Sequence, residues 1–241
     1  MSPEERAAFF TVHCDLPREG PGEAADVLWA LGHLNATGPL DVMDAACGPG
    51  ADLMTLAKAL PDATITGIEK TPHFVIEAQA RTADYAPRVS VIEGDMAQPG
   101  GPYDLIWCAG AVYFLGVTEG LKIWRTALKS GGAVVFSEPV LLGPRTPEVA
   151  AFWEEYPQIT DLDGIIARVE AAGYSARAHR MIVGAPWDAY YAPMQTRIDA
   201  LRGQNPDAAL TAALDENQLE IDRWRAAPEQ IAYALLIVTP T

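Results

Sequence analysis

Short hydrophobic runs alternate with helical patterns between residues 40 and 140. Runs rich in β-branched and other apolar residues predict strands at 40–46, 63–69, 88–95, 103–110 and 133–139. Between them, apolar residues recur at helical spacing over 51–60, 72–83 and 119–129. This alternation is typical of a parallel sheet whose crossover helices cover its faces.

The rest of the chain predicts two more strands with helices around them. Helical patterns cover 146–157 and 161–174, and strands are expected at 175–183 and 231–240. The intervening segment, 184–230, is mostly helical and far longer than a hairpin loop requires. We therefore expect an α/β fold: a Rossmann-like, seven-stranded, mostly parallel sheet with helices on both faces and a helical insertion between the last two strands.

Length favours one domain. The 241 residues suffice for one sizeable α/β domain and are too few for two of typical size. We expect a single domain over 1–241, with a lid and helix at 1–36, a ligand-binding core at 37–140, and substrate-side helices and last strands at 141–241, including the insertion 184–230.

Charge and cysteine content narrow the partners. A formal net charge of −15 argues against nucleic acid, because binding to phosphates needs clustered Lys and Arg. The first residues, MSPEERAAFF, lack the basic region of a signal peptide, and no apolar run is long enough to span a bilayer, so we expect a cytoplasmic protein without membrane contact. The scattered His and Cys residues predict no metal site. A homodimer is left open.

A glycine-rich turn follows the first predicted strand. Asp44 ends that strand, and Ala46, Cys47, Gly48 and Gly50 lead into the next helix. Ligands of open parallel sheets gather at such strand ends. Glycines let the backbone approach a ligand, and the helix offers free N–H groups to a carboxylate. The turn therefore suits a nucleoside that carries a carboxylate.

Two further strand ends carry acids. Glu69 ends the second strand, where a carboxylate can accept hydrogen bonds from both hydroxyls of a ribose; Lys70 follows it. Asp95 and Met96 follow the third strand, where the acid can accept from an exocyclic amine while the thioether packs on a ring. Each acid alone could be a cap or a solvated residue, but their order and their common position at strand ends favour a nucleoside site.

Across residues 37–140 this pattern resembles class I S-adenosylmethionine-dependent methyltransferases, particularly the ubiquinone and menaquinone biosynthesis type. Asp44–Gly50 matches the family's acidic residue and alternating glycines, with Ala46 at the first glycine position. The resemblance implies S-adenosylmethionine as cofactor, with its methionine part at Gly48 and Gly50, its ribose at Glu69 and its adenine beside Asp95 and Met96. It also implies that Cys108, at the end of the fourth strand, faces the sulfonium and the substrate.

The chain also resembles, over most of its length, an uncharacterised bacterial subgroup with an HxxLPREGPG segment, here residues 13–22. That subgroup usually has an acid at the position of Ala109, so a contact to substrate or cofactor is changed here. No substrate follows from this resemblance.

In-line methyl transfer mainly requires alignment of nucleophile, methyl and sulfur, so no general base is obligatory. If a base is used, His13 in the lid is the first candidate and Tyr113 the next. Arg18, Tyr113, Glu138 and Tyr191 are the substrate-binding candidates, and each could equally be a packed residue without chemistry.

Several interpretations of the aromatic residues and of the function remain open. The aromatic residues Trp153, Tyr156, Trp187, Tyr190 and Tyr191 either line a substrate pocket or anchor the insertion. A nicotinamide-dependent oxidoreductase is the first alternative function, although Leu53 stands where its fingerprint requires a third glycine. A non-catalytic cofactor-binding protein is the second. The expected function is methyl transfer to a small-molecule acceptor.

Overall fold

A computed structural model describes residues 2–241 and contains one seven-stranded sheet. The strands are β1 (Asp41–Ala45), β2 (Thr64–Glu69), β3 (Val89–Glu93), β4 (Tyr103–Cys108), β5 (Leu128–Leu141), β6 (Tyr174–Ile182) and β7 (Ile231–Pro240). Their order is β3-β2-β1-β4-β5-β7-β6, and β7 runs antiparallel to both of its neighbours while the other pairs are parallel. The predicted seven-stranded, mostly parallel sheet is confirmed.

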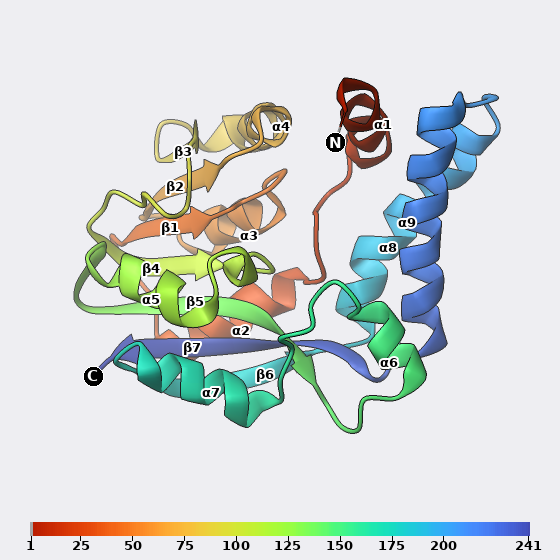
Figure 1. Cartoon of the computed structure of the whole chain (residues 1–241). Coiled ribbons are helices and arrows are strands. Elements are labelled where there is room, and N and C mark those ends of the chain that lie inside the picture. The colour runs from red at the N-terminus through yellow and green to blue at the C-terminus, as the bar shows by residue number, and fades with distance from the viewer. Residues whose placement is uncertain (1) are drawn as a thin grey trace.

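Helices cover both faces of the sheet (Figure 1). One face packs against α2 (Ala24–Leu34), α3 (Ala51–Ala59) and α4 (Pro72–Thr82). The other packs against α5 (Val117–Arg125) and α7 (Leu162–Ala171). Each helix turns an apolar stripe to the sheet, as Leu53, Leu56 and Ala57 do in α3, and these stripes form two buried cores on opposite sides of the sheet.

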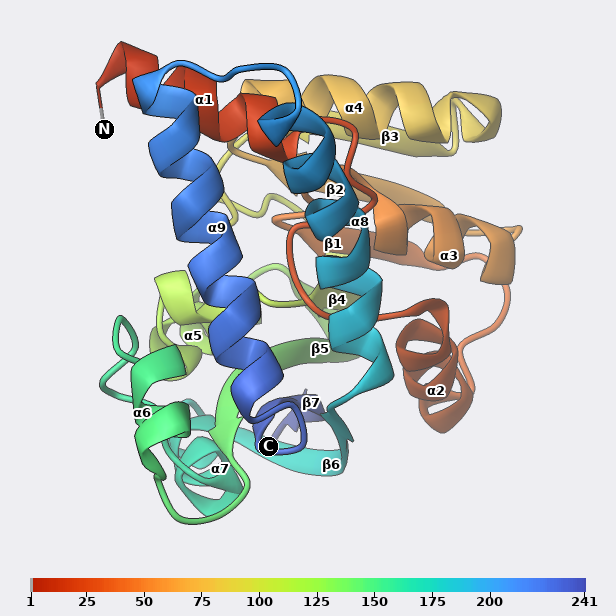
Figure 2. The ribbon, with the colours of Figure 1, turned by 90° about the vertical axis from the view of Figure 1, so that its right-hand side faces the viewer.

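A second group of helices lies across one edge of the sheet. It consists of α1 (Pro3–His13), α6 (Pro147–Phe152), α8 (Ala185–Arg202) and α9 (Ala208–Ala226), which contact one another. The helices α8 and α9 occupy the sequence between β6 and β7 and stand side by side in Figure 2. We call α1, α6, α8 and α9 the cap. Figure 1 places the cap at the edge toward which the parallel strands point, so it faces the carboxyl ends of β1, β2 and β4.

The start of β5 differs from the prediction. We expected Ser130, Gly131 and Gly132 to turn the chain into a strand beginning at residue 133, but β5 begins at Leu128. The register with β4 shifts between the pairs Tyr103–Leu128 and Leu105–Ala133, so the Ser-Gly-Gly segment is a bulge within the strand. Gly131 has a φ of 81°, which only glycine adopts readily.

In the described part of the chain, no helix has the length and apolar character needed to cross a membrane.

Candidate active site

A cavity of about 520 Å³ lies at the carboxyl ends of β1, β2, β3 and β4. Its walls come from the ends of these strands, the turn before α3 and an N-terminal segment that includes Arg18, Glu19 and Pro21. We call this the first cavity. Its volume falls within the range of small-molecule and cofactor sites.

The turn after β1 has an unusual backbone. Ala46, Gly48 and Gly50 have φ angles of 57°, 53° and 93°. Left-handed conformations suit glycine, so Ala46 holds a strained conformation that explains why the family pattern has glycine there. At Gly50 a Cβ atom would come within 3.2 Å of the Ala78 backbone, so this glycine allows α3 and α4 to pack closely. Ala46 and Gly48 line the first cavity, whereas Gly50 shapes the turn from behind it.

Asp44 places an unsatisfied carboxylate in this cavity. The residue is 2% exposed, and its Oδ2 atom is buried without a hydrogen-bond partner in the described chain. Burial, together with the nearby Asp52 and Glu69 carboxylates, raises the pKa of Asp44 well above its ordinary value. Buried polar groups normally have partners, so the cavity wall presents a site for a cationic or hydrogen-bond-donating group.

Glu69 supports the turn and also borders the cavity. Its Oε2 accepts a hydrogen bond from the Gly48 N–H at 3.0 Å, and its Oε1 accepts one from the Thr71 N–H at 2.8 Å. Each carboxylate oxygen can accept a second bond, so the residue can still bind two hydroxyls. Its position at the end of β2, lining the cavity, suits the predicted ribose contact.

The far end of the cavity is polar on one side and apolar on the other. Lys70 pairs with Asp95 at 3.1 Å, and the Ala97 N–H also binds the Asp95 carboxylate, so these contacts lower the pKa of Asp95. Met96 is buried beside it, and its backbone oxygen accepts a hydrogen bond from Trp124. An acceptor beside a buried thioether can hold a flat heterocycle with an exocyclic amine.

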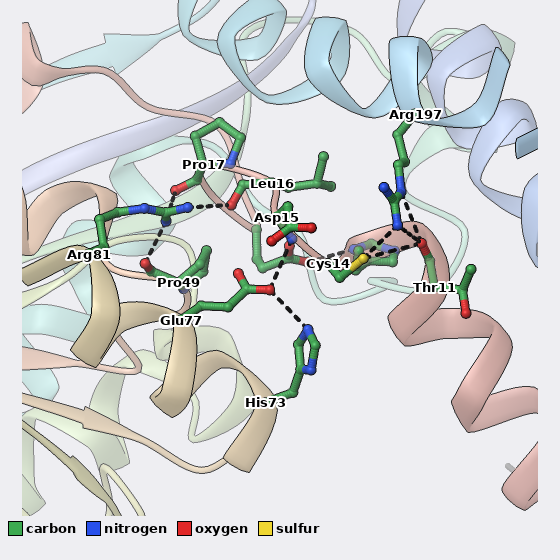
Figure 3. Close-up of polar contacts among 12 residues, drawn as sticks. Thr11, Cys14, Asp15, Leu16, Pro17, Pro49, His73, Glu77, Arg81 and Arg197 are labelled. Carbon is green, nitrogen blue, oxygen red and sulfur yellow. Dashed lines mark hydrogen bonds and ion pairs between the residues drawn. The ribbon is translucent and has the colours of Figure 1, made fainter. Parts of the chain in front are cut away.

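Residues 14–22 form a strap between the cap and the glycine turn (Figure 3). Arg81 of α4 donates hydrogen bonds to the backbone oxygens of Leu16, Pro17 and Pro49, at 3.2, 3.1 and 2.5 Å. It therefore ties the strap to the turn. On the cap side, Arg197 of α8 binds the Thr11 backbone oxygen and Cys14 Sγ.

Arg18 lies in the strap and lines the first cavity. Its guanidinium donates to Asp52 Oδ1 at 3.0 Å, while Trp107 Nε1 donates to Asp52 Oδ2 at 2.9 Å. Asp52 is thus fixed from both sides, and Arg18 is held at the start of α3, where it adds positive charge to the helix N-terminus.

A second cavity, of about 930 Å³, adjoins the first. Both are lined by Glu19, Gly20, Pro21, Gly110, Tyr113 and Phe114. The second cavity extends into the cap, where it is walled by residues of α6, α8 and α9 and by Tyr233 of β7. The two spaces meet at the strap and at the end of β4, the place expected for a reacting group.

The structure brings most of the predicted residues to these cavities. The first cavity is lined by Arg18, Asp44, Ala46, Cys47, Gly48, Glu69, Lys70, Asp95, Met96 and Tyr113. Tyr191 lines the second cavity, and its hydroxyl donates to Glu220 at 2.8 Å. Besides Gly50, three predicted residues line neither cavity: His13, Cys108 and Glu138.

Those three residues are engaged elsewhere. His13 is 5% exposed, with Nδ1 at 2.6 Å from Glu19 Oε2 and Nε2 at 3.0 Å from Asn217 Oδ1, so neither nitrogen is free to take a proton from a substrate. Cys108 is fully buried in the core, and burial raises the pKa of its thiol. Glu138 is also fully buried and accepts hydrogen bonds from Tyr156 and Arg168.

Comparison with known proteins finds a matching family model and solved structures of the same fold. Residues 42–132 match a family model described as a methyltransferase domain. A solved S-adenosylmethionine-dependent methyltransferase from Geobacter sulfurreducens, in complex with S-adenosylhomocysteine, superimposes with a TM-score of 0.86 at 20% identity, covering 98% of both chains. A solved S-adenosylmethionine-dependent methyltransferase from Thiobacillus denitrificans, also in complex with S-adenosylhomocysteine, superimposes with a TM-score of 0.85 at 20% identity, covering 97% of this chain and 98% of the other. The chain has the fold of S-adenosylmethionine-dependent methyltransferases.

Among relatives in sequence, the trans-aconitate 2-methyltransferase of Klebsiella pneumoniae (strain 342) is 34% identical over 100 residues, which cover 41% of this chain and 37% of the relative. The chain thus spans well under half of that relative's length. The family model covers β1 to β4 and the start of β5, and the cap lies outside its range of 42–132.

Some residues at the site were not predicted. Arg81 and Asp52 position the strap and the turn, and Glu220 and Tyr233 line the second cavity. Arg81 and Asp52 lie on predicted helices where a charged residue signals only a solvated face. Glu220 and Tyr233 come from a helix and a strand far along the chain, and no local spacing connects them with Tyr113.

Proposed function

We propose that this protein transfers a methyl group from S-adenosylmethionine to a small-molecule acceptor. The observation that carries the proposal is Asp44, which lines a cavity at the carboxyl ends of the parallel strands and has a buried carboxylate oxygen without a partner in the described chain. The methionine part of S-adenosylmethionine carries an ammonium group that would supply the missing donor. The family match at 42–132 and the relatives' printed names support the same assignment.

The remaining walls suit the rest of the cofactor. The methionine carboxylate would lie at the start of α3 near Arg18, the ribose hydroxyls at Glu69, and the adenine between Asp95 and Met96. When bound, the cofactor supplies an electrophilic methyl group on a sulfonium. The protein's part is to orient that methyl toward the second cavity, which adjoins the first at the strap and the end of β4, and to exclude water through the strap and the cap.

Several narrower assignments belong to this proposal. We place the reaction in the cytoplasm, with no nucleic acid partner and with a homodimer left open. We also keep the resemblance to the ubiquinone and menaquinone biosynthesis type, and that of His13–Gly22 to the bacterial subgroup. The strap's contacts with both cavities support a role for that segment in the active site.

The proposal is tested by calorimetric titration with S-adenosylmethionine, S-adenosylhomocysteine and NAD. We expect micromolar binding of the first two and none of NAD. Glu69→Ala should weaken binding at least tenfold, since it removes the ribose acceptor and a support of the turn. Gly48→Val should also weaken it, because the substitution strains a residue at a φ of 53° and narrows the cavity.

Glu93→Ala is the matched control. Glu93 ends β3, pairs in register with Glu69 and lines neither cavity, so its loss should leave cofactor affinity unchanged. Binding of NAD in place of S-adenosylmethionine, or an equal effect of Glu69→Ala and Glu93→Ala, would count against the proposal.

A further inference from the structure

The second cavity combines aromatic walls with negative charge. Its aromatic residues come from the cap, from the end of β4 and from β7; they are Tyr113, Phe114, Phe152, Trp153, Tyr156, Trp187, Tyr190, Tyr191 and Tyr233. Its charged residues are Glu19, Glu154, Glu155, Glu216, Glu220 and Arg223. Arg223, the one cation in that list, is paired with Glu154 at 3.2 Å. The cavity therefore offers no unpaired positive charge to an anionic ligand.

Two tyrosines that line this cavity have hydroxyls without a hydrogen-bond partner in the described chain. Tyr190 is 9% exposed and Tyr233 is 8% exposed, yet neither hydroxyl has a hydrogen-bond partner in the described chain. Neither hydroxyl is among the buried atoms sealed from solvent, so the small exposed part of each residue includes its polar end. Since both residues line the cavity, these hydroxyls are available to a ligand there.

Glu220 lies within the same group. Glu220 is an exposed residue that lines the second cavity, and its Oε1 accepts a hydrogen bond from the Tyr191 hydroxyl. Tyr113, Tyr190 and Tyr233 line this cavity together with Glu220. Burial raises the pKa values of these three phenols, and the Glu220 charge adds to each shift. Tyr113 also lines the first cavity, which puts this group beside the expected position of the methyl donor.

We propose that the methyl acceptor is an amine that enters the second cavity as an ammonium ion, held by Glu220 and the surrounding phenols. Aromatic faces and carboxylates stabilise ammonium groups, and phenol oxygens accept their N–H bonds. A tricarboxylate such as trans-aconitate would instead meet like charges, which cost binding free energy. The inference rests on the proposed function and specifies its substrate class.

The reaction balances without a further reactant. The ammonium first gives one proton to Glu220, whose exposed side chain passes it to water. The nitrogen lone pair then attacks the methyl carbon, and the carbon–sulfur bond breaks with its electron pair going to sulfur. The products are a methylated ammonium ion and S-adenosylhomocysteine.

Three probes that differ mainly in charge test the inference: phenethylamine, 2-phenylethanol and phenylacetate. Binding is followed by quenching of tryptophan fluorescence, since Trp153 and Trp187 line the cavity, and by calorimetry, with and without saturating S-adenosylhomocysteine. We expect the amine to bind at least tenfold more tightly than the alcohol, and the phenylacetate to bind most weakly. Glu220→Gln, which can still accept from Tyr191, should weaken amine binding about tenfold and leave the alcohol unchanged.

The control is Asp222→Asn, an exposed acid on the same helix that lines neither cavity; it should leave all three affinities unchanged. Equal affinity for amine and alcohol, tighter binding of phenylacetate, no amine binding, or an equal loss for all probes in Glu220→Gln would overturn the inference. Binding of S-adenosylhomocysteine itself is measured separately and concerns the first cavity. If this ligand does not bind, the methyltransferase proposal is wrong. The probe titrations without S-adenosylhomocysteine still decide whether the second cavity selects amines.

Discussion

At the scale of single residues, Glu138 was a candidate for substrate binding, but its burial points to a structural role. It lies within β5, beside Pro139 of the second cavity, and is fully buried. One carboxylate oxygen accepts hydrogen bonds from Tyr156 and Arg168, and the other has no partner in the described chain. Burial raises the pKa of Glu138 to about 7. The residue joins β5 to α7 and to the segment after α6, so its structural role is to fix these elements of the cap side to the sheet.

This pKa shift predicts a pH dependence of stability. Between the unfolded pKa near 4.5 and the folded pKa near 7, the folded protein binds more protons than the unfolded chain, so its stability falls as pH rises through this window. The contribution is at most about 3 kcal/mol across the window. Glu138→Gln should therefore lose less stability than the wild type between pH 5 and pH 8 in urea unfolding.

The exposed acid Glu148 of α6 provides the comparison, because Glu148→Gln changes the same chemical group without burial. That variant should keep the wild-type pH dependence. If Glu138→Gln also kept it, the folded protein would hold Glu138 with an ordinary pKa and the burial argument would be wrong.

At the scale of elements, the strap connects parts of the chain that are far apart in sequence. Arg81 fixes it to the glycine turn, and strap residues line both cavities. Arg81→Ala should weaken S-adenosylhomocysteine binding about tenfold in calorimetry, because a cavity wall loses its anchor and must be ordered on binding. Faster proteolysis within residues 14–22 should accompany the loss.

Arg88 offers a matched control for Arg81. It also binds two backbone oxygens, those of Ala57 and Leu60, but at the end of α3 away from the cavities. Arg88→Ala should lower thermal stability without changing cofactor affinity. An equal loss of affinity in both variants would show that general destabilisation, and not the strap, causes the effect.

Local patterns predicted the elements well where one rule decides the structure. Short apolar runs and a glycine turn specify β1, α3 and the sheet, because strands buried on both faces carry apolar residues without strict alternation. The start of β5 was missed because Ser130–Gly132 has the same composition in a bulge as in a turn. The cofactor side could be predicted for the same reason: its residues follow consecutive strands and meet at one sheet edge.

The acceptor side could not be predicted, because its contacts join distant segments. His13 looked like a free base in sequence, but Asn217, 204 residues away, occupies its second nitrogen. Glu220 carries no local signal, and it lines the second cavity with Tyr113 and Tyr233 because α9 packs beside α8 (Figure 2). Packing of the cap therefore determines which residues face the substrate.

At the scale of the whole molecule, the first cavity is walled by the ends of the parallel strands, the glycine turn, the strap and the start of α3, so a cofactor there would contact all four. A ligand that binds only the folded chain stabilises it by mass action, by about 2.7 kcal/mol at 100 times its Kd. For a chain of this size we expect S-adenosylhomocysteine at that concentration to raise Tm by about 5–10 °C. Glu93→Ala should keep the whole shift, since its side chain lines neither cavity, whereas Glu69→Ala, with a tenfold higher Kd, should lose about half of it at the same ligand concentration. Scanning calorimetry of the wild type and both variants at several ligand concentrations measures these shifts. If the Tm of the wild type did not change under saturating ligand, the ligand would not bind preferentially to the folded state described here.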